Sequence, residues 1–539
     1  MPGGQRFTRA LRAHNVSPLD ACLMALAVLF GAASLAYPFA WDQGINYYVG
    51  REWLLRGSIP YRDLFDHKPP GIYVVHAICI RLFGEGMHGI RIAELGCVLG
   101  LGWLCAKLLT RGDERLRPGV LGAAVFGASF FHYGFFDFCQ TAQCEIWATT
   151  LAVAGLVVVV RRRGHAAGLV AGLLGGAALL MKFPIALFLA FVVMALAWRA
   201  WREVRGAGHV VVALLWYAAG VLAAPVATLA YFAAHGAAGA MFDVVFRANW
   251  HYLGQEPRTL GLAPVLSKLD EVWRDFAPAI TLVILACAGA AAISLARGTR
   301  AWRAHALAAA LLGTTVLMVL LQRKFYFYHW AVAVAPLSLA VGALARDASS
   351  LVRQRKWRGP ALVTAALLGA YVTSGTTFEG WLRSNQATVA WLTGAIDRDR
   401  FASTFRFVYD YRDCERMGQW LRANSAPDDR VLVRGTAAEI YAAAGRHASS
   451  RFFWTPWLTL PTREYRREEW LREDREAIER DPPRFVVALA RPVAIIDSAR
   501  WFAPLGYRER EYVGGFVVLE YDARTATGPS RGRATVAAP

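Results

Sequence analysis

The sequence predicts a polytopic α-helical membrane protein with about eleven transmembrane helices and a C-terminal external α/β domain. First, 56% of the 539 residues are hydrophobic and only 18% are charged, whereas soluble domains are about a quarter charged. Second, apolar runs of about 20 residues, the length that crosses a bilayer, recur along the chain. Third, clusters of arginine fill every second gap between these runs.

The apolar runs and the basic clusters together predict the topology. We expect spans near residues 18–40, 88–110, 118–135, 142–160, 166–181, 184–200, 208–234, 276–296, 304–322, 329–345 and 360–378. Basic clusters lie at 6–12, 111–117, 161–163, 199–205, 297–303 and 353–358. Because cytoplasmic loops carry the excess of Lys and Arg, we expect a cytoplasmic N-terminus, a periplasmic or extracellular C-terminal domain and a location in the inner (plasma) membrane. The same rule accounts for the net charge of +19 without a nucleic-acid partner.

This topology leaves three segments outside, at about 42–88, 236–275 and from 379 onward. In the first, residues 47–56 and 71–83 are expected as short helices along the membrane interface. We divide the chain into a membrane domain (1–378), an external α/β domain (379–522) and a disordered tail (523–539). Strands are expected at 430–433, 485–487 and 513–519, with a polar helix at 461–480.

The first external segment holds the densest group of polar residues. Asp42 directly follows the first span, and Asp63, Asp66, His67 and Lys68 precede a Pro-Pro-Gly turn. A carboxylate and an ammonium group fixed by prolines are suited to deprotonate an acceptor and to hold a phosphate. The alternatives are that Asp42 caps a helix and that Lys68 only snorkels to the interface.

These residues resemble the first external loop of family 39 glycosyltransferases in the GT-C superfamily, which include protein O-mannosyltransferases and lipid A aminoarabinose transferases. The resemblance rests on an Asp after the first span, on Gly-x-x-Pro-Tyr-x-Asp at 57–63 and on Lys-Pro-Pro-Gly at 68–71. In weaker form it extends over residues 18–378. It implies a GT-C-like fold and transfer of a sugar from a polyprenyl-phosphate carrier to a hydroxyl on the outer face, with inversion.

The resemblance also implies roles for single residues. Asp42 corresponds to the acidic residue that activates the acceptor, and Lys68 to the lysine near the carrier phosphate. Many members carry a second acid after the first, but Gln43 stands there, and an amide can be neither a base nor an anionic metal ligand. We expect the following loop residues to bind substrate: Gln43, Tyr61, Asp63 and His67.

Further candidates lie at the outer ends of later spans. Asp137 and Glu145 flank the start of the fourth span, where similar proteins carry acidic residues lining the acceptor side, so we include them with Asp42 as catalytic candidates; interface capping is the alternative. Lys182, Arg323 and Lys324 are expected to bind the donor phosphate, since cations on the outer face need a partner; for Lys182, a snorkelling anchor is the alternative. Tyr328 and His329 are expected to bind substrate; membrane anchoring is the alternative for the aromatic rings.

We predict a membrane glycosyltransferase that uses a polyprenyl-phosphate-linked sugar as its donor. Its acceptor would be a lipid, a glycan or a protein, and membrane lipids would surround it. Two other functions stay open: a carrier or flippase for polyprenyl-linked sugars, and a non-catalytic protein of envelope-glycan assembly. Neither GxGxxG nor a P-loop occurs, which argues against a nucleotide-sugar donor. No cofactor is indicated by the residues, and a requirement for a divalent cation stays open. We expect the external domain to tune acceptor choice or partner binding rather than to perform the chemistry, so that truncation near residue 395 leaves activity measurable.

Overall fold

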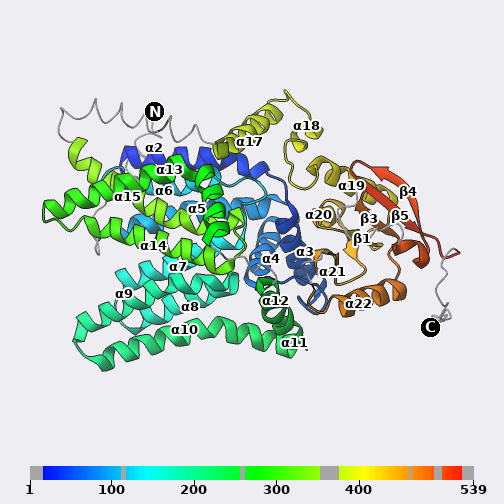
Figure 1. Cartoon of the computed structure of the whole chain (residues 1–539), viewed down its shortest axis with the longest axis horizontal. Helices are drawn as coiled ribbons and strands as arrows, with labels where there is room; N and C mark the ends of the chain where they lie inside the picture. Colours follow the sequence, from blue (N-terminus) through cyan, green and yellow to red (C-terminus); the bar gives the residue numbers. More distant parts are fainter. Residues whose placement is uncertain are drawn as a thin grey trace, which may run out of the picture.

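The computed structural model describes residues 16–110, 117–254, 262–352, 369, 376–459, 464–490 and 501–524. A long helical part lies at one end and a sheet-containing part at the other, with α3 and α4 between them (Figure 1). The catalytic candidates of the first loop lie on or next to α3 and α4, so the junction between the two parts positions them.

The helical part contains α2 (Pro18–Ala32), η1 (Ala33–Ala36), α3 (Trp41–Arg56), α4 (Gly71–Phe83), α5 (His88–Leu108), α6 (Val120–Tyr133), α7 (Cys144–Arg161), α8 (His165–Met181), η2 (Phe183–Ile185), α9 (Ala186–Val204), α10 (Ala207–Ala234), α11 (Ala238–Phe242), the π-helix η3 (Asp243–Ala248), α12 (Asn249–Gly254), α13 (Leu262–Ala296), α14 (Trp302–Gln322), η4 (Phe327–Ala333) and α15 (Val334–Val352). The C-terminal part contains α17 (Thr376–Leu392), α18 (Arg398–Ala402), α19 (Tyr411–Asn424), β1 (Arg430–Arg434), α20 (Glu439–Ala444), β2 (His447–Ala448), α21 (Pro456–Thr459), α22 (Arg467–Arg480), β3 (Phe485–Leu489), η6 (Ala503–Leu505), β4 (Tyr507–Val513) and β5 (Phe516–Tyr521).

The described helices confirm the predicted class, a polytopic helical membrane protein. Seven are long and apolar enough to cross a membrane, and they match predicted spans. Three more predicted spans correspond to shorter apolar helices, at 120–133, 165–181 and 280–296, and the span expected at 360–378 falls mostly outside the described residues. The span expected at 276–296 is the C-terminal part of a longer helix, because α13 runs without interruption from Leu262 to Ala296.

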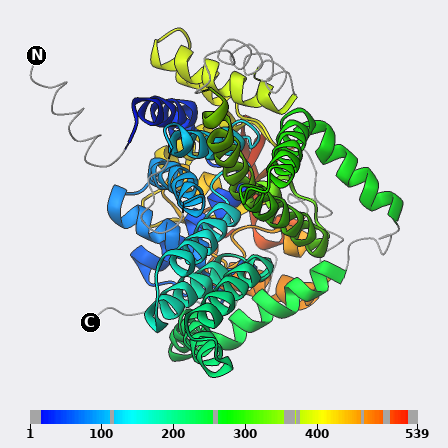
Figure 2. The same ribbon diagram turned by 90° about the vertical axis from the view of Figure 1, so that its left-hand side faces the viewer.

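Small residues let the membrane helices approach closely. At Gly172 in α8, an added Cβ atom would overlap the carbonyl oxygen of Tyr217 in α10. Such contacts between backbones drive helix association in lipid, where the hydrophobic effect between helices is absent. Seen from the helical end, α8, α9 and α10 lie together at one side of the bundle (Figure 2).

The C-terminal part forms one five-stranded sheet in the order β2-β1-β3-β5-β4. β1 pairs in parallel with β2 and β3, whereas β5 pairs in antiparallel with β3 and β4. The first two expected strands are present as β1 and β3. The strand expected at 513–519 is present as β5 but begins three residues later, because the chain turns at Gly514, whose φ of +58° suits glycine; Val513 is the last residue of β4.

The C-terminal part packs directly against α3. Tyr48 of α3 lies 4.6 Å from the ring of Tyr441 and 4.5 Å from that of Phe453. Its hydroxyl also accepts a hydrogen bond from the backbone N–H of Ala448, at 2.7 Å. The same apolar core contains residues of the first loop and of the sheet. Truncation near residue 395 would therefore expose one face of α3, and the expectation that activity survives this truncation stays a prediction.

Gly44 lets α3 approach α20 closely, since a Cβ atom there would lie 2.6 Å from the backbone nitrogen of Glu439. We expect Gly44→Ala to separate α3 from α20, because backbone cannot yield as a flexible side chain can. The cost should be about 1–3 kcal/mol, as for other overpacked sites, and should lower the unfolding temperature in detergent. Gly96→Ala in α5 is the control, since nothing lies within 4 Å of its added Cβ. Equal unfolding temperatures for the two variants would contradict this packing.

Glu439 should make stability depend on pH. Its carboxyl is buried, and burial raises its pKa to about 8 from an ordinary 4.5. Between these values the unfolded chain releases a proton that the folded chain keeps, so stability falls as pH rises. Each pKa unit corresponds to about 1.4 kcal/mol. We expect Glu439→Gln to flatten the change in unfolding temperature between about pH 5 and 8, whereas the exposed Glu476→Gln should not. An unchanged slope in Glu439→Gln would disprove this.

Candidate functional site

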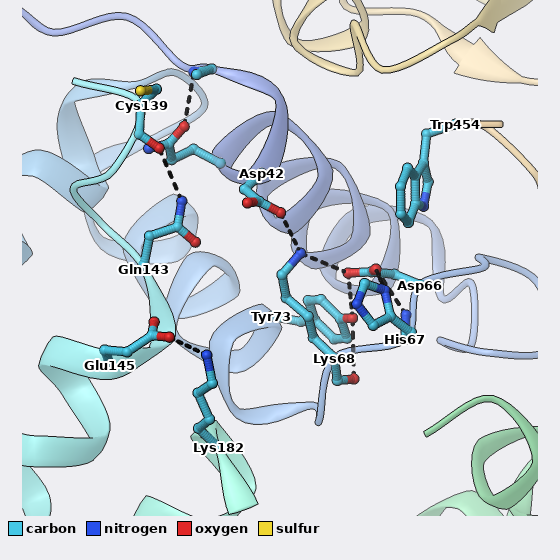
Figure 3. Close-up of polar contacts among 12 residues, drawn as sticks. Asp42, Asp66, His67, Lys68, Tyr73, Cys139, Gln143, Glu145, Lys182 and Trp454 are labelled. Carbon is cyan, nitrogen blue, oxygen red and sulfur yellow. Dashed lines mark hydrogen bonds and ion pairs between the residues drawn. The ribbon is translucent and has the colours of Figure 1, made fainter. Parts of the chain in front are cut away.

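The first half of the site is a chain of charges between α3 and the loop before α4. Lys68 Nζ lies 2.8 Å from Asp42 Oδ1 and 3.6 Å from Asp66 Oδ2 (Figure 3). The side chains of Lys68 and Asp42 are only 11% and 14% exposed. The structure therefore brings together the acid and the cation on which the sequence resemblance depends.

Asp42 stands in the first turn of α3 without capping it. Ala40 is the N-cap residue, and Gln43 Oε1 accepts the hydrogen bond from the Ala40 N–H at 2.9 Å. The capping role that the sequence left open for Asp42 thus belongs to Gln43. The carboxylate of Asp42 is turned toward Lys68 instead, where the positive end of the helix dipole also favours its charge.

The loop from residue 61 to 73 fixes the direction of Lys68. Tyr61 donates its hydroxyl to the carbonyl of Lys68 at 2.9 Å, and Tyr73 donates its hydroxyl to Asp66 Oδ2 at 2.7 Å. His67 contacts Asp66 Oδ1 through its backbone N–H, at 2.8 Å, and through its ring. These bonds, with the two prolines that follow, hold the ammonium group in place before any ligand binds.

The charges within this loop support one another. Burial raises the pKa of Asp66, but the charges of Lys68 and His67 and hydrogen bonds from His67 and Tyr73 more than offset it, so the pKa lies below its ordinary value. Burial lowers the pKa of Lys68, but Asp42 and Asp66 raise it above its ordinary value. Asp66 is therefore ionised and Lys68 charged throughout the physiological range.

A second ion pair forms the other half of the site. Lys182, at the end of α8, contacts the buried carboxylate of Glu145 in the first turn of α7 (Figure 3). His329 Nε2 lies 3.9 Å from Glu145 Oε1, and the Lys182 ammonium lies 5.4 Å from the centre of the Tyr328 ring. Figure 3 shows this pair and the Asp42–Lys68 pair in one close-up of the site.

Several candidates lie outside this arrangement. Gln43 is fully buried, and its amide donates to the carbonyls of Phe138 and Thr141, at 3.0 and 2.6 Å. Because these bonds use its polar groups within the protein, the structure does not present Gln43 to a substrate. Asp63 pairs with Arg62 and accepts from the Ile59 N–H, both at 2.8 Å, which makes it a turn residue.

Asp137 also remains apart from both ion pairs. It accepts a hydrogen bond from the Phe138 N–H at 2.7 Å, and burial raises its pKa. Among the described residues, no hydrogen bond or ion pair joins Asp137 to Asp42 or Glu145. Its catalytic role stays a prediction that the geometry does not favour.

The two cations after α14 differ in their surroundings. Lys324 lies 3.3 Å from the centre of the Tyr252 ring and donates to the Tyr252 carbonyl at 3.0 Å. Arg323 ends α14 in the left-handed conformation, with φ +57°, and is exposed. Lys324 therefore fastens η4 to α12, and the expected pairing of both cations around a phosphate stays a prediction.

The site list drawn from the sequence missed Asp66, Tyr73 and Tyr252. Asp66 and Tyr73 flank the Lys-Pro-Pro-Gly motif, so their nearness to Lys68 in sequence was the available signal. Tyr252 had no such signal, because its hydroxyl meets that of Tyr326 at 2.8 Å across a separation of 74 residues. Among the described residues, no group of three or more His, Cys, Asp or Glu is placed to hold a metal ion.

Residues 69–322 match the family model of glycosyltransferase family 87, slightly less than half of the chain. Asp42 and Lys68 precede the matched range. No curated protein matches. Among solved structures, ArnT from Cupriavidus metallidurans bound to undecaprenyl phosphate is 14% identical over 95% of this chain and 99% of that one, with a TM-score of 0.42. The Archaeoglobus fulgidus oligosaccharyltransferase, in complex with Zn and sulfate, is 12% identical over 92% and 72%, with a TM-score of 0.40.

The family 87 match and the membrane-spanning helices agree on the class of protein, although the first loop resembles family 39. The predicted superfamily is thereby confirmed, and the chain is a multi-pass membrane glycosyltransferase of the GT-C type.

Proposed function

We propose that this protein transfers a sugar from a polyprenyl-phosphate-linked donor to a hydroxyl group, on the outer face of the inner membrane and with inversion. The observation that carries the proposal is the presence of two largely buried cation–carboxylate pairs, Asp42–Lys68 and Glu145–Lys182, in one close-up of the structure (Figure 3). Such a site offers cations to a phosphate and carboxylates to an acceptor hydroxyl.

The donor half of the reaction rests on Lys68 and Lys182. A lipid phosphate is already a good leaving group, so the reaction needs charge stabilisation more than a general acid. Two ammonium groups at fixed positions would hold the phosphate oxygens and stabilise the charge that develops as the anomeric C–O bond breaks. The buried partners of Lys68 keep it oriented, so little reorganisation is needed at that moment.

The acceptor half rests on Asp42. The acceptor oxygen attacks the anomeric carbon opposite the phosphate, and its proton passes to the Asp42 carboxylate. One displacement of this kind inverts the anomeric configuration. Because Lys68 binds Asp42 in this structure, an incoming phosphate competes for the ammonium and releases the carboxylate for its role as base. Glu145 pairs with Lys182 in the same manner.

The arrangement along the chain completes the proposal. The membrane domain would extend over residues 1–378 and the external domain over 379–522, with the N-terminus in the cytoplasm. Support comes from the alternation of basic clusters and from the position of α3 and α4 between the helical part and the sheet (Figure 1). The acceptor is a hydroxyl of a lipid, a glycan or a protein.

The test is a transfer assay with the full chain in liposomes. Polyprenyl-phosphate sugars labelled in the sugar are supplied with a pool of membrane lipids, glycans and peptides. We expect release of polyprenyl phosphate and a labelled product of inverted anomeric configuration, and no use of nucleotide sugars. Movement of the intact donor across the bilayer without cleavage would show a flippase and contradict the proposal.

A further inference from the structure

Arg91 in α5 joins the segment before Asp42 to the segment before Glu145. It is fully buried. Its guanidinium donates to the carbonyl of Pro38 at 2.8 Å and, on the other side, to Thr141 Oγ1 at 2.7 Å and to the carbonyl of Phe138 at 3.3 Å. Only a planar group with several donors can satisfy both segments at once.

Gln43 makes a parallel connection from the residue next to Asp42. Its amide nitrogen donates to the carbonyl of Phe138 and to that of Thr141. The Phe138 carbonyl thus accepts from both Gln43 and Arg91. We call these two side chains, with the oxygen atoms of Pro38, Phe138 and Thr141 that they bind, the brace.

Glu94 connects Arg91 to the segment that precedes α7. Its carboxylate lies 3.5 Å from Arg91, contacts His132 Nε2 at 2.8 Å and accepts a hydrogen bond from the N–H of Ala142. All three ionisable side chains are buried, and a charge in such surroundings is costly unless it is fully paired. If Arg91, Glu94 and His132 only stabilised the fold, apolar side chains of similar size would serve as well. Their presence indicates that the segments they connect must keep a fixed geometry.

The loop that the brace holds leads directly into the first turn of α7, which carries Glu145. On the other side, the brace holds the first turn of α3, which carries Asp42. We propose that Gln43 and Arg91 are positioning residues that set the placement of Asp42 relative to Glu145, and so align acceptor and donor. This inference rests on the proposed function.

Two substitutions separate this role from the role in substrate binding that the sequence suggested. Gln43→Glu would create the adjacent pair of acids that many family 39 proteins carry, yet its carboxylate would face two carbonyl oxygens and repel them. A residue that binds the substrate would instead change substrate affinity, and a metal-binding residue would tolerate a carboxylate. Arg91→Lys keeps the charge, but one ammonium cannot reach both segments.

The experiment measures kcat and donor affinity separately for Gln43→Glu and Arg91→Lys, alone and combined with Asp42→Asn. We expect each single variant to lower kcat about 10–100-fold, as displacement of a reacting group by about 1 Å does, with donor affinity within about threefold of the wild type. In the Asp42→Asn background we expect almost no further loss, because the brace acts through the group that is already removed.

His305→Asn is the matched control, because the buried His305 pairs with the partly exposed Asp347 at 2.8 Å, between α14 and α15. If His305→Asn lowers kcat, the double variant with Asp42→Asn should show the product of the two single fold-losses. If Arg91→Lys fails to fold, Thr141→Val removes a single acceptor of the brace and takes its place. Multiplicative losses for the brace variants would overturn the inference while leaving the proposed function intact. A fully active Asp42→Asn enzyme would overturn the proposed function itself, and with it a brace that acts through Asp42.

Discussion

Replacing Asp42 with asparagine should lower turnover by about 10²–10⁴-fold, the range that a general base contributes. Asparagine keeps the size and hydrogen-bonding capacity of the side chain but cannot accept the proton. Donor affinity should stay the same or become slightly tighter, because Asp42 and the donor phosphate compete for Lys68, which lies 2.8 Å from Asp42 Oδ1. The effect should therefore appear in kcat and not in donor binding.

The measurement compares transfer rate and donor binding for Asp42→Asn and for a control, Asp428→Asn, whose side chain is 92% exposed. Circular dichroism and thermal unfolding establish that both proteins fold. A helix cap would be served equally well by asparagine, so that alternative expects full activity. A rate near that of the wild type would remove Asp42 from the mechanism.

Replacing Lys68 with alanine should weaken donor binding by about 10–150-fold, which corresponds to the 1.5–3 kcal/mol of a charged hydrogen bond. The loss has two origins. The phosphate loses a fixed cation, and Asp42 and Asp66 lose the ammonium that neutralises them. The two carboxylates would then repel the incoming phosphate.

Lys68→Arg separates these two causes of weaker binding, because it keeps the positive charge while replacing the ammonium with a planar guanidinium. We expect it to bind the donor better than Lys68→Ala and to transfer the sugar more slowly than the wild type. Polyprenyl phosphate itself is the probe, titrated into the protein in detergent. Lys268→Ala is the control for a general loss of positive charge, since this lysine is 55% exposed in its side chain. Equal affinities for Lys68→Ala and Lys268→Ala would place the phosphate elsewhere.

The sequence by itself determined the class of protein and the position of most spans. A bilayer demands apolar segments of a minimum length, and this demand is local, so hydropathy finds helices such as α5, α10 and α14. The bounds of α4 are also set locally, because a Pro-Pro pair precedes Gly71 and a glycine follows Phe83. The nearness of Lys68 to an acid of the first loop was also predictable, because Pro69 and Pro70 restrict that loop.

Only the tertiary structure decided which polar side chains face one another. Gln43 stands beside Asp42 in the sequence, yet one turns to carbonyls 95 and 98 residues away and the other to Lys68, 26 residues away. Lys182 meets Glu145 across 37 residues, and Lys324 meets Tyr252 across 72. Such pairs depend on the angles and depths at which helices pack, which hydrophobic periodicity does not encode, because it records only which face of each helix is buried.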